Sequence, residues 1–386
     1  MPTKPPYGLL LIAGNLTHQE NYARALAADP RCRLIGLTDE ADVPDRRAEL
    51  NRMLAEELEI PLLPDLDAAL SRDDVDIVSV CAEPERRARL AVKCAQAGKH
   101  LYIDKPLCTT VKDAGDVVNA VDEAGVTNHL FSLVHTPTAH RAREIVGSGR
   151  LGQLTAIHYE LLFAKGIAGT ADLSQPRREQ ATAERFTFVD SKRELFCVGW
   201  YPLVFFTWLT GRRVTSVYAT TSNYFFAEHQ RNGVEDFACL LLQLEGGITA
   251  TVTCGRAGWS SHPSHGIHKI HLTGESAAVD LDAYEPRLEI YSDAPAWQQP
   301  SSGHPEDPMG FWSSTQIAGG IAPKTSWLSV QPAVTDDAVY FLDCLEQGRP
   351  SDVPVALGAH AVDVILAGYR SAAAGQPVAV SRTARA

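Results

Sequence analysis

The feature that most constrains the fold of this chain is an alternation of short apolar segments and helical patterns over its first 130 residues. Residues 7–13 are almost entirely apolar, and a segment with helical periodicity follows at 19–28. Further apolar segments lie at 33–38, 75–81, 100–103 and 129–134, separated by helical patterns at 45–58, 84–98 and 111–124. Continuous apolar strands that alternate with helices are typical of parallel strands buried on both faces. We therefore predict a Rossmann-type, doubly wound α/β domain over residues 1–130.

The remainder of the chain, residues 131–386, has a different pattern. Long segments in which apolar and polar residues alternate predict the strands of a large, mainly antiparallel sheet. These segments lie at 154–163, 214–224, 236–244, 247–255, 267–273 and 287–292. Helices are predicted at 196–209, 335–347 and 356–374, and a loop excursion at 293–330. We therefore predict a second domain of the α+β class.

Composition and charge exclude several classes of protein. The 47 acidic residues outnumber the 35 basic ones, and the net charge of −12 is opposite to what a nucleic-acid-binding protein needs. The longest apolar runs, such as 7–13 and 200–206, are shorter than the roughly 18 residues that cross a bilayer. The eight cysteines are scattered without a CxxC pair, so we expect free thiols. With no signal peptide visible at the N-terminus, we expect a cytoplasmic protein that binds neither nucleic acid nor membrane.

The first predicted strand ends in a loop that could hold a dinucleotide. Loops of the GxGxxG type use glycines so that backbone N–H groups can approach a pyrophosphate. Only Gly14 of that pattern is present, because Ile12 and Thr17 stand at the outer glycine positions. An ordinary turn between a strand and a helix is an equally good interpretation of this motif alone.

The second predicted strand ends in a carboxylate that bears on the choice of dinucleotide. Asp39 could accept hydrogen bonds from a ribose 2′-hydroxyl and would repel a 2′-phosphate, which favours NAD over NADP. It could also simply cap the next helix. The neighbouring residues Arg46 and Arg47 leave NADP open.

The most specific motif lies at residues 97–107, which read AGKHLYIDKPL. A DIVSV strand precedes it at 76–80, residues 145–154 read IVGSGRLGQL, and residues 367–378 read AGYRSAAAGQPV. These motifs resemble those of the glucose–fructose oxidoreductase / inositol dehydrogenase / MocA (Gfo/Idh/MocA) family, which usually has Glu in place of Asp104. The resemblance extends over nearly the whole chain. It implies a nicotinamide site at the C-terminal edge of the parallel sheet, a substrate wall formed by the second domain, and a homo-oligomer, dimer or tetramer.

The resemblance also implies which residues form the site. Lys105 would contact the nicotinamide ribose and the reacting hydroxyl, and would act as the principal acid or base with a lowered pKa. Tyr201 would donate a hydrogen bond or a proton to the substrate oxygen, and His135 would orient a hydroxyl. Cofactor-binding residues would be Gly14, Asn15, Leu16, Asp39, Ala82, Pro84, Asp104 and Lys105. The site also departs from the family pattern: Cys197 replaces its Asp, Tyr201 replaces its His, and the family usually has a histidine near Arg87.

Each catalytic candidate also has an interpretation without catalysis. Lys105 could pair with Asp104 at a strand end. Tyr201 could be a core residue of an apolar helix, and His135 could be a structural histidine.

A run of histidines near residue 265 invites a metal-site interpretation. His262, His265, His268 and His271 are spaced by three, but residues 267–273 are predicted to form a strand. On a strand, His268 and His271 point to opposite faces, which excludes a compact cluster. We therefore expect no metal site and place His265 or His268 near the pocket instead.

Together these patterns predict an NAD-dependent dehydrogenase, with NADP not excluded, that acts on a CH–OH group of a sugar, cyclitol or related polyol. Two alternatives remain open. The first is a redox-neutral relative that retains NAD and cleaves a glycoside or eliminates a group. The second is a non-catalytic binding or regulatory relative, which the incomplete glycine motif would explain.

Overall fold

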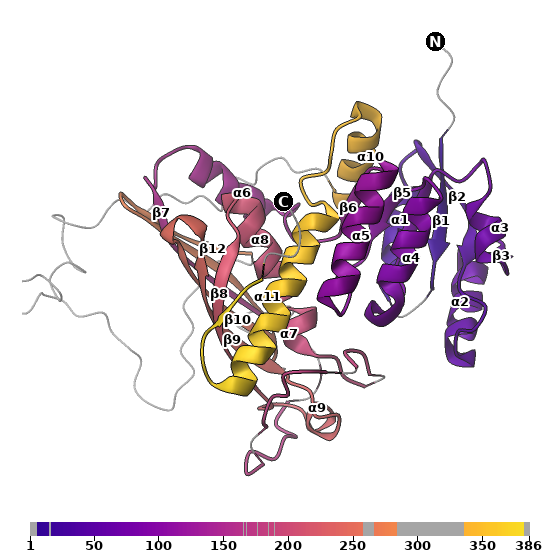
Figure 1. The fold of residues 1–386 in the computed structure, drawn as a ribbon. Helices are drawn as coiled ribbons and strands as arrows, with labels where there is room; N and C mark the ends of the chain where they lie inside the picture. Colours follow the sequence, from indigo (N-terminus) through magenta and orange to yellow (C-terminus); the bar gives the residue numbers. More distant parts are fainter. Residues whose placement is uncertain are drawn as a thin grey trace, which may run out of the picture.

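The computed structural model describes residues 6–381 with gaps at 15–16, 165, 167, 176, 184, 189, 258–265 and 284–335. The chain forms two domains that lie side by side, each built around one β-sheet (Figure 1). The predicted fold class, a Rossmann-type parallel sheet followed by an α+β domain, is confirmed. The strand predicted at 287–292 and the loop excursion at 293–330 lie outside the described residues.

The first domain contains a parallel sheet of order β3-β2-β1-β4-β5-β6. Its strands are β1 (Tyr7–Ile12), β2 (Cys32–Thr38), β3 (Leu62–Leu63), β4 (Ile77–Val80), β5 (His100–Ile103) and β6 (Asn128–Leu130). The helices that alternate with them are α1 (Gln19–Ala27), α2 (Asp45–Glu57), α3 (Leu66–Leu70), α4 (Pro84–Gln96) and α5 (Val111–Ala124). The strand order reverses between β1 and β4, and such switch points are where doubly wound sheets bind ligands.

Local sequence explains most of these elements. Every residue of β1 is buried, as expected for a central strand covered on both faces. The α5 helix begins after Thr110, whose side chain accepts a hydrogen bond from the Asp113 N–H, and it ends at Gly125 in the left-handed conformation. The sequence did not predict β3, because this strand is only two residues long and partly exposed.

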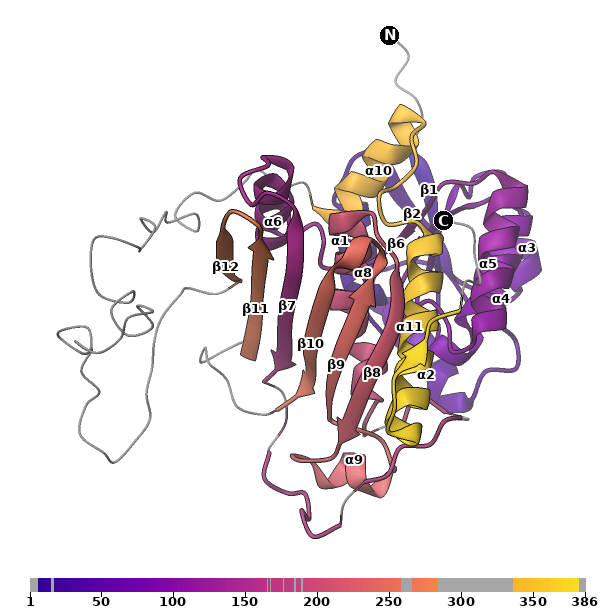
Figure 2. The same cartoon turned by 60° about the vertical axis from the view of Figure 1, so that its left-hand side comes forward.

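The second domain contains a sheet of order β12-β11-β7-β10-β9-β8-β13, whose strands lie beside one another in Figure 2. These are β7 (Leu154–Phe163), β8 (Val214–Ser222), β9 (Phe237–Leu244), β10 (Thr249–Arg256), β11 (Gly266–Gly274), β12 (Ala278–Asp282) and β13 (Val378–Ala379). Among the described strands, β10 and β7 pair in parallel and the other neighbours pair antiparallel. The mainly antiparallel sheet predicted from the alternating segments is therefore confirmed.

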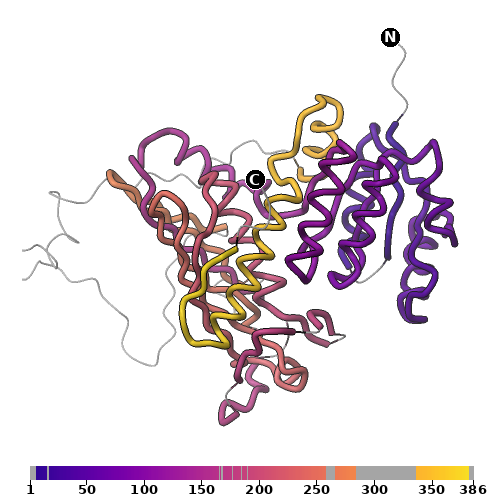
Figure 3. Tube along the Cα trace, viewed as in Figure 1, coloured from indigo at the N-terminus to yellow at the C-terminus, as the bar shows by residue number. Residues whose placement is uncertain are grey.

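The helices of the second half of the chain cover this sheet and connect the domains. They are α6 (Pro137–Gly147), α7 (Glu194–Cys197), α8 (Trp200–Thr210), α9 (Ala227–Arg231), α10 (Asp337–Gln347) and α11 (Val355–Ala374). The long α11 packs against β8 and α8 of the second domain and against α5 of the first. In the tube of Figure 3, α10 lies beside the first domain although it follows the second sheet in sequence. Its residues Phe341 and Leu342 belong to the same buried cluster as Tyr22 and Tyr102.

The apolar helix predicted at 196–209 is interrupted. The chain forms α7, then passes through Val198 and Gly199 into α8. A Cβ at Gly199 would lie 2.5 Å from the carbonyl oxygen of Leu195, so this close approach requires glycine. The α8 helix is buried on nearly all sides, which explains its uniformly apolar sequence.

The remaining expectations about thiols and membranes can be compared with the structure. All eight cysteines are free, and six of them are buried. No helix in the described part of the chain is long and apolar enough to cross a membrane.

Candidate active site

A cleft of about 660 Å³ opens at the C-terminal edge of the parallel sheet and reaches across to the second domain. The first domain lines it with the loop after β1, the start of α4 and residues 104–106 after β5. The second domain lines it with residues 185–188 and with Lys192, Phe196 and Cys197. A crevice at this edge of a doubly wound sheet, closed by a second domain, is a typical place for a dinucleotide and its substrate.

The described residues on either side of positions 15–16, after β1, have one glycine of the usual pattern and make several specific contacts. The Thr17 hydroxyl donates a hydrogen bond to the Gly14 carbonyl at 2.7 Å. A Cβ at Gly14 would lie 2.8 Å from Cα of Asn51, so this glycine allows the loop to pack against α2. The buried Gln19 side chain ties the loop to β4, where the Ser79 hydroxyl donates to its Oε1 at 2.6 Å. These contacts fix the described residues Gly14, Thr17 and Gln19 at the end of β1 and the start of α1.

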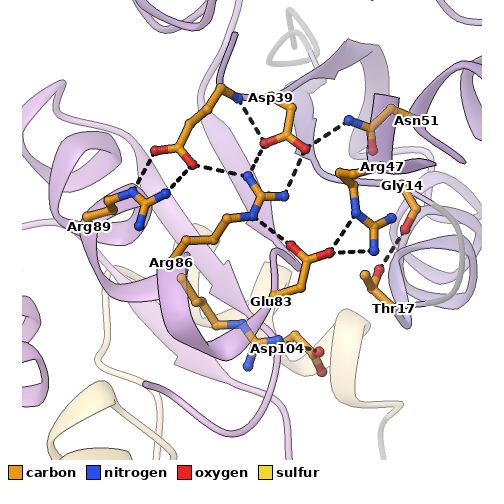
Figure 4. A network of polar contacts seen from close by, with 11 residues as sticks. Gly14, Thr17, Asp39, Arg47, Asn51, Glu83, Arg86, Arg89 and Asp104 are labelled. Carbon is orange, nitrogen blue, oxygen red and sulfur yellow. Dashed lines mark hydrogen bonds and ion pairs between the residues drawn. The ribbon is translucent and has the colours of Figure 1, made fainter. Parts of the chain in front are cut away.

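Asp39, at the end of β2, belongs to a network of alternating charges. Arg86 contacts both of its carboxylate oxygens, and the Asn51 amide donates to Oδ2 at 2.8 Å (Figure 4). The ion-paired members of the network are Asp39, Glu40, Glu83, Arg47, Arg86 and Arg89. Burial alone would raise the pKa of Glu83, but Arg86 and Arg47 lower it to about 2. Because Arg86 balances the charge of Asp39, this carboxylate repels a 2′-phosphate less than the sequence suggests.

Asp104, directly before the catalytic candidate Lys105, is the centre of a second buried network. The Tyr22 hydroxyl donates to its Oδ1 at 2.8 Å, and Nδ1 of His18 lies 3.0 Å from the same oxygen. Arg87 donates to Oδ2 at 2.9 Å and also to the Pro106 carbonyl. Burial alone would raise the pKa of Asp104, but Arg87, His18 and Lys105 hold it well below its ordinary value. The carboxylate is therefore ionised and fixes the backbone around Lys105.

Lys105 lies at the floor of the cleft with its ammonium group directed at the second domain. Its Nζ donates to the Cys197 carbonyl at 3.0 Å and lies 4.8 Å from the centre of the Tyr201 ring. Burial alone would lower the pKa of Lys105, but Tyr201, Cys197 and Asp104 outweigh burial and raise it. Burial also raises the pKa values of the Tyr201 hydroxyl and the Cys197 thiol, so both groups are neutral at pH 7. The lowered lysine pKa predicted from the sequence is thus not what this environment produces.

Glu85 connects the two domains across the cleft. It lies in the first turn of α4, and its Oε1 accepts hydrogen bonds from the backbone N–H groups of Phe186 and Thr187, both at 3.0 Å. The Phe186 ring packs against Phe196, with 4.5 Å between the ring centres. These contacts hold residues 185–188 over the cleft.

The structure brings most of the predicted site residues together. Ala82, Pro84, Asp104 and Lys105 line the cleft directly. Gly14 and Asp39 lie behind it, in contact with residues that line it, and Tyr201 reaches it through Lys105. Asn15 and Leu16 lie outside the described residues.

His135 does not lie in the cleft lining. The β6 strand ends at Leu130, and the following turn directs His135 away from the cleft toward α10. Its ring stacks on Tyr340 with 4.0 Å between the centres, and its Nε2 lies 3.3 Å from Oδ1 of Asp352. The structure therefore gives no support for the predicted substrate contact of this histidine.

His268 and His271 point to opposite faces of the second sheet, as their positions on one strand predict. His268 is buried and hydrogen-bonded to the Tyr159 hydroxyl at 2.7 Å, whereas His271 lies on the other face beside Asp280. Neither residue lines the cleft, so the predicted pocket role of His268 is not supported. His262 and His265 lie outside the described residues.

Sequence reasoning missed four residues that shape the cleft. These are His18, Glu85, Arg86 and Arg87, of which sequence inspection noted Arg87 only as a departure from a family pattern. Arg86 and Asp39 are 47 positions apart in the chain, and no local pattern signals their contact. The clustering of basic residues at 86, 87 and 89 is the available signal, because α4 there meets the carboxylates that follow β2 and β5.

Comparison with known families decides where this chain belongs. Residues 11–131 match the family model described as an oxidoreductase family with an NAD-binding Rossmann fold, and residues 139–291 match the GFO/IDH/MocA C-terminal domain. The chain belongs to the Gfo/Idh/MocA family. As a member, it is an NAD(P)-dependent oxidoreductase of the dehydrogenase class, and its Rossmann domain binds NAD.

Individual relatives of this Gfo/Idh/MocA protein are distant. An uncharacterized oxidoreductase of Streptococcus pneumoniae serotype 4 is 23% identical over 315 residues, which are 77% of this chain and 78% of that protein. A 1,5-anhydro-D-fructose reductase of Ensifer adhaerens is 39% identical over 81 residues, 21% of this chain and 24% of that protein. The structure of the WlbA dehydrogenase from Bordetella pertussis, in complex with NADH and UDP-GlcNAcA, covers 99% of this chain and 100% of its own at 17% identity and a TM-score of 0.68. At this identity the structural similarity shows the fold alone.

Proposed function

We propose that this enzyme transfers a hydride between NAD and a hydroxyl-bearing carbon of a sugar, cyclitol or related polyol. The observation that carries the proposal is the position of Lys105. Its buried ammonium stands at the floor of the cleft, between the Asp104 network of the first domain and Tyr201 of the second. A sugar-type substrate is supported by the sugar-processing relatives above, a 1,5-anhydro-D-fructose reductase and a dehydrogenase bound to a nucleotide sugar.

The residues of the cleft fit a dinucleotide along its length. Thr17 and His18 line the cleft at the start of α1, where the N–H groups of a helix N-terminus attract anions such as a pyrophosphate. Arg46, Arg47 and Arg86 line the part of the cleft near Asp39, where they would hold the adenosine end. The nicotinamide end would lie at Lys105, where residues 185–188 close the cleft from the other domain.

The protonation state of Lys105 determines whether this side chain can donate a proton to the substrate or accept one from it. Bound nicotinamide supplies or removes the hydride at the substrate carbon. In the reducing direction, the charged Lys105 donates a proton to the carbonyl oxygen as that oxygen becomes a hydroxyl. In the oxidising direction, only the neutral amine can accept the hydroxyl proton. The raised pKa of Lys105 therefore predicts that reduction proceeds at neutral pH and that oxidation accelerates as the pH rises.

Cys197 stands where the family carries a carboxylate, but it does not supply the proton chemistry of that carboxylate. Its thiol is neutral, and its contact with Lys105 is made by the backbone carbonyl. We propose that Cys197 positions the lysine, and that Lys105 and Tyr201 carry the proton chemistry without a carboxylate partner.

The first experiment is binding of NAD and NADH by calorimetry, followed by a screen of sugars and cyclitols for NADH formation. Lys105→Ala is expected to lower kcat by about 10²–10⁴-fold, the usual contribution of a positioned acid or base. Lys112→Ala is the control, because that side chain is 81% exposed on α5 and does not line the cleft. Wild-type turnover by Lys105→Ala would overturn the assignment. Cleavage of a glycoside without NADH accumulation would indicate the redox-neutral alternative, and absence of dinucleotide binding the non-catalytic one.

A further inference from the structure

A compact cluster of imidazoles and carboxylates lies where β6 meets α10, away from the cleft. His129 is at the centre of β6, and His135 lies in the turn that follows. Asp337 begins α10, and Asp352 lies in the segment between α10 and α11. None of these residues lines the cleft, so the proposed dehydrogenase chemistry does not use them.

Three of these residues have the geometry of a metal-binding set. One ligand atom each from His129, His135 and Asp337 lies within 4.8 Å of the other two. The side chains of His129 and His135 are 0% and 2% exposed, and that of Asp337 is 12% exposed. Tetrahedral zinc ligands, at about 2.0–2.2 Å from the ion, are separated by about 3.4 Å. A bound ion would therefore draw the three groups together by at most about 1.4 Å.

A second observation is that several polar atoms of the cluster have no hydrogen-bond partner among the residues that the structure describes. They are Nδ1 and Nε2 of His135, Oδ1 of Asp337 and Oδ1 of Asp352, all buried. Nε2 of His135 lies 3.3 Å from Oδ1 of Asp352, at the distance of an ion pair, whereas Nδ1 of His135 has no such neighbour among the described residues. Buried polar groups are almost always satisfied, so this concentration of unpaired atoms calls for a ligand.

The surrounding residues orient the three ligands. Nδ1 of His129 lies 2.7 Å from the Ser351 hydroxyl, which directs the opposite nitrogen, Nε2, at Asp337. The Tyr102 hydroxyl donates to Oδ2 of Asp337 at 2.6 Å, and the Tyr340 ring stacks on His135. Outer partners of this kind fix the ring orientation of metal-ligating histidines.

A purely structural hydrogen-bond cluster is the competing explanation. It accounts for His129, whose Nε2 can donate to Asp337 at 3.0 Å. It leaves Nδ1 of His135 and Oδ1 of Asp337 unexplained, because a buried polar atom without a partner is destabilising. An ion that accepts electron pairs from an imidazole and a carboxylate explains both histidines at once.

We propose that His129, His135 and Asp337 bind a divalent transition-metal ion of the zinc class, with Asp352 as a neighbouring carboxylate that can complete the coordination. Nitrogen and oxygen donors in this combination are those that zinc prefers. The ion would tie β6 of the first domain to α10 and to the turn before α6, so its role is to stabilise the junction between domains. The sequence predicted no metal site, because these ligands are far apart in the chain.

The test uses the full-length protein, stripped of metal with a chelator and dialysed. Titration with Zn²⁺ in a calorimeter is expected to show one equivalent bound, and Zn²⁺ is expected to raise the Tm. Substitution with Co²⁺ is expected to give the visible absorption of a low-symmetry site with nitrogen and oxygen ligands. A strong thiolate-to-cobalt band would instead place the ion on cysteines and overturn the assignment.

Two variants make the test specific. His135→Phe keeps an aromatic ring over Tyr340 but removes the donor, and it is expected to weaken Zn²⁺ binding at least 100-fold and to abolish the Tm shift. Asp337→Asn is the second variant, in case the first does not fold, with the same expected loss. His271→Phe is the matched control, because this histidine also lies beside a carboxylate, Asp280, but on an exposed sheet face. Failure of the stripped protein to bind Zn²⁺, or unchanged affinity in a folded ligand variant, would refute the site.

Discussion

Replacing Arg87 by alanine tests whether the Asp104 network stabilises the fold as the structure indicates. Arg87 and Asp104 are 2% and 3% exposed, and among the described residues Arg87 provides the one guanidinium in contact with that carboxylate. Removing one partner of a buried ion pair costs about 3–5 kcal/mol, because the remaining charge stays buried. Asp104 would keep its contacts with Tyr22 and His18, so we expect a loss near the lower end, about 3 kcal/mol.

The effect of Arg87→Ala must also depend on pH. In the native protein the depressed pKa of Asp104 contributes stability that is present above the unfolded-state value of about 3.9 and is lost as pH falls through the folded-state pKa. Without Arg87, burial of the carboxylate raises its pKa, so the variant regains stability when Asp104 is protonated. The difference between wild type and variant is therefore expected to be largest at pH 7 and to shrink toward about pH 4.

The assay is urea unfolding, followed by tryptophan fluorescence and circular dichroism across this pH range. Arg89→Ala is the matched control, since Arg89 lies on the same helix and pairs with Glu40, but its side chain is 59% exposed. Such a surface pair contributes about 0–1 kcal/mol. If Arg87→Ala proved as mild as Arg89→Ala, or if its effect did not vary with pH, the reasoning about a buried charge would be refuted.

Three further predictions follow from the cleft. Arg86→Ala removes the charge that balances Asp39, so calorimetry should show the affinity for NADP falling about tenfold relative to NAD; an unchanged ratio would exclude this role. Glu85→Ala removes the acceptor that holds residues 185–188, so limited trypsin digestion should cleave that segment several-fold faster. If the variant resisted trypsin as well as the wild type does, the anchor of this segment would lie elsewhere. Gly14→Ala places a Cβ 2.8 Å from Cα of Asn51, so urea unfolding should show a free energy of unfolding lower by about 1–3 kcal/mol. Calorimetry should also show weaker NAD binding, and an unchanged stability and affinity would show that the loop relaxes freely.

The fold could be predicted because its signal is local. The apolar run of β1 and the alternation along β7 each report their burial through neighbouring residues alone. The break between α7 and α8 could not be predicted, because it depends on how closely Gly199 approaches Leu195 in three dimensions. Residue types that favour a helix on both sides of Gly199 do not reveal that contact.

The candidate site could be predicted only in part, for a similar reason. Lys105 and Asp104 lie within a motif that resembles a family, so their position in the cleft followed from the chain itself. Their partners come from distant segments, since His18 lies 86 positions from Asp104. His135 was assigned to the pocket on proximity to a strand end, but the turn after β6 directs its ring the other way. The direction in which a side chain points after a strand depends on the backbone turn there, and amino-acid composition does not encode that turn.

The packing of α10 into the first domain has a consequence for synthesis of the chain. When the ribosome has completed β6, the parallel sheet has all its strands, but the buried cluster around Tyr22 and Tyr102 still lacks Phe341 and Leu342. That apolar surface stays open to solvent until α10 has been translated, after the strands β7 to β12 of the second sheet. The nascent first domain is thus exposed to aggregation for most of its time on the ribosome, and a fragment ending at β6 would not be a self-sufficient folding unit.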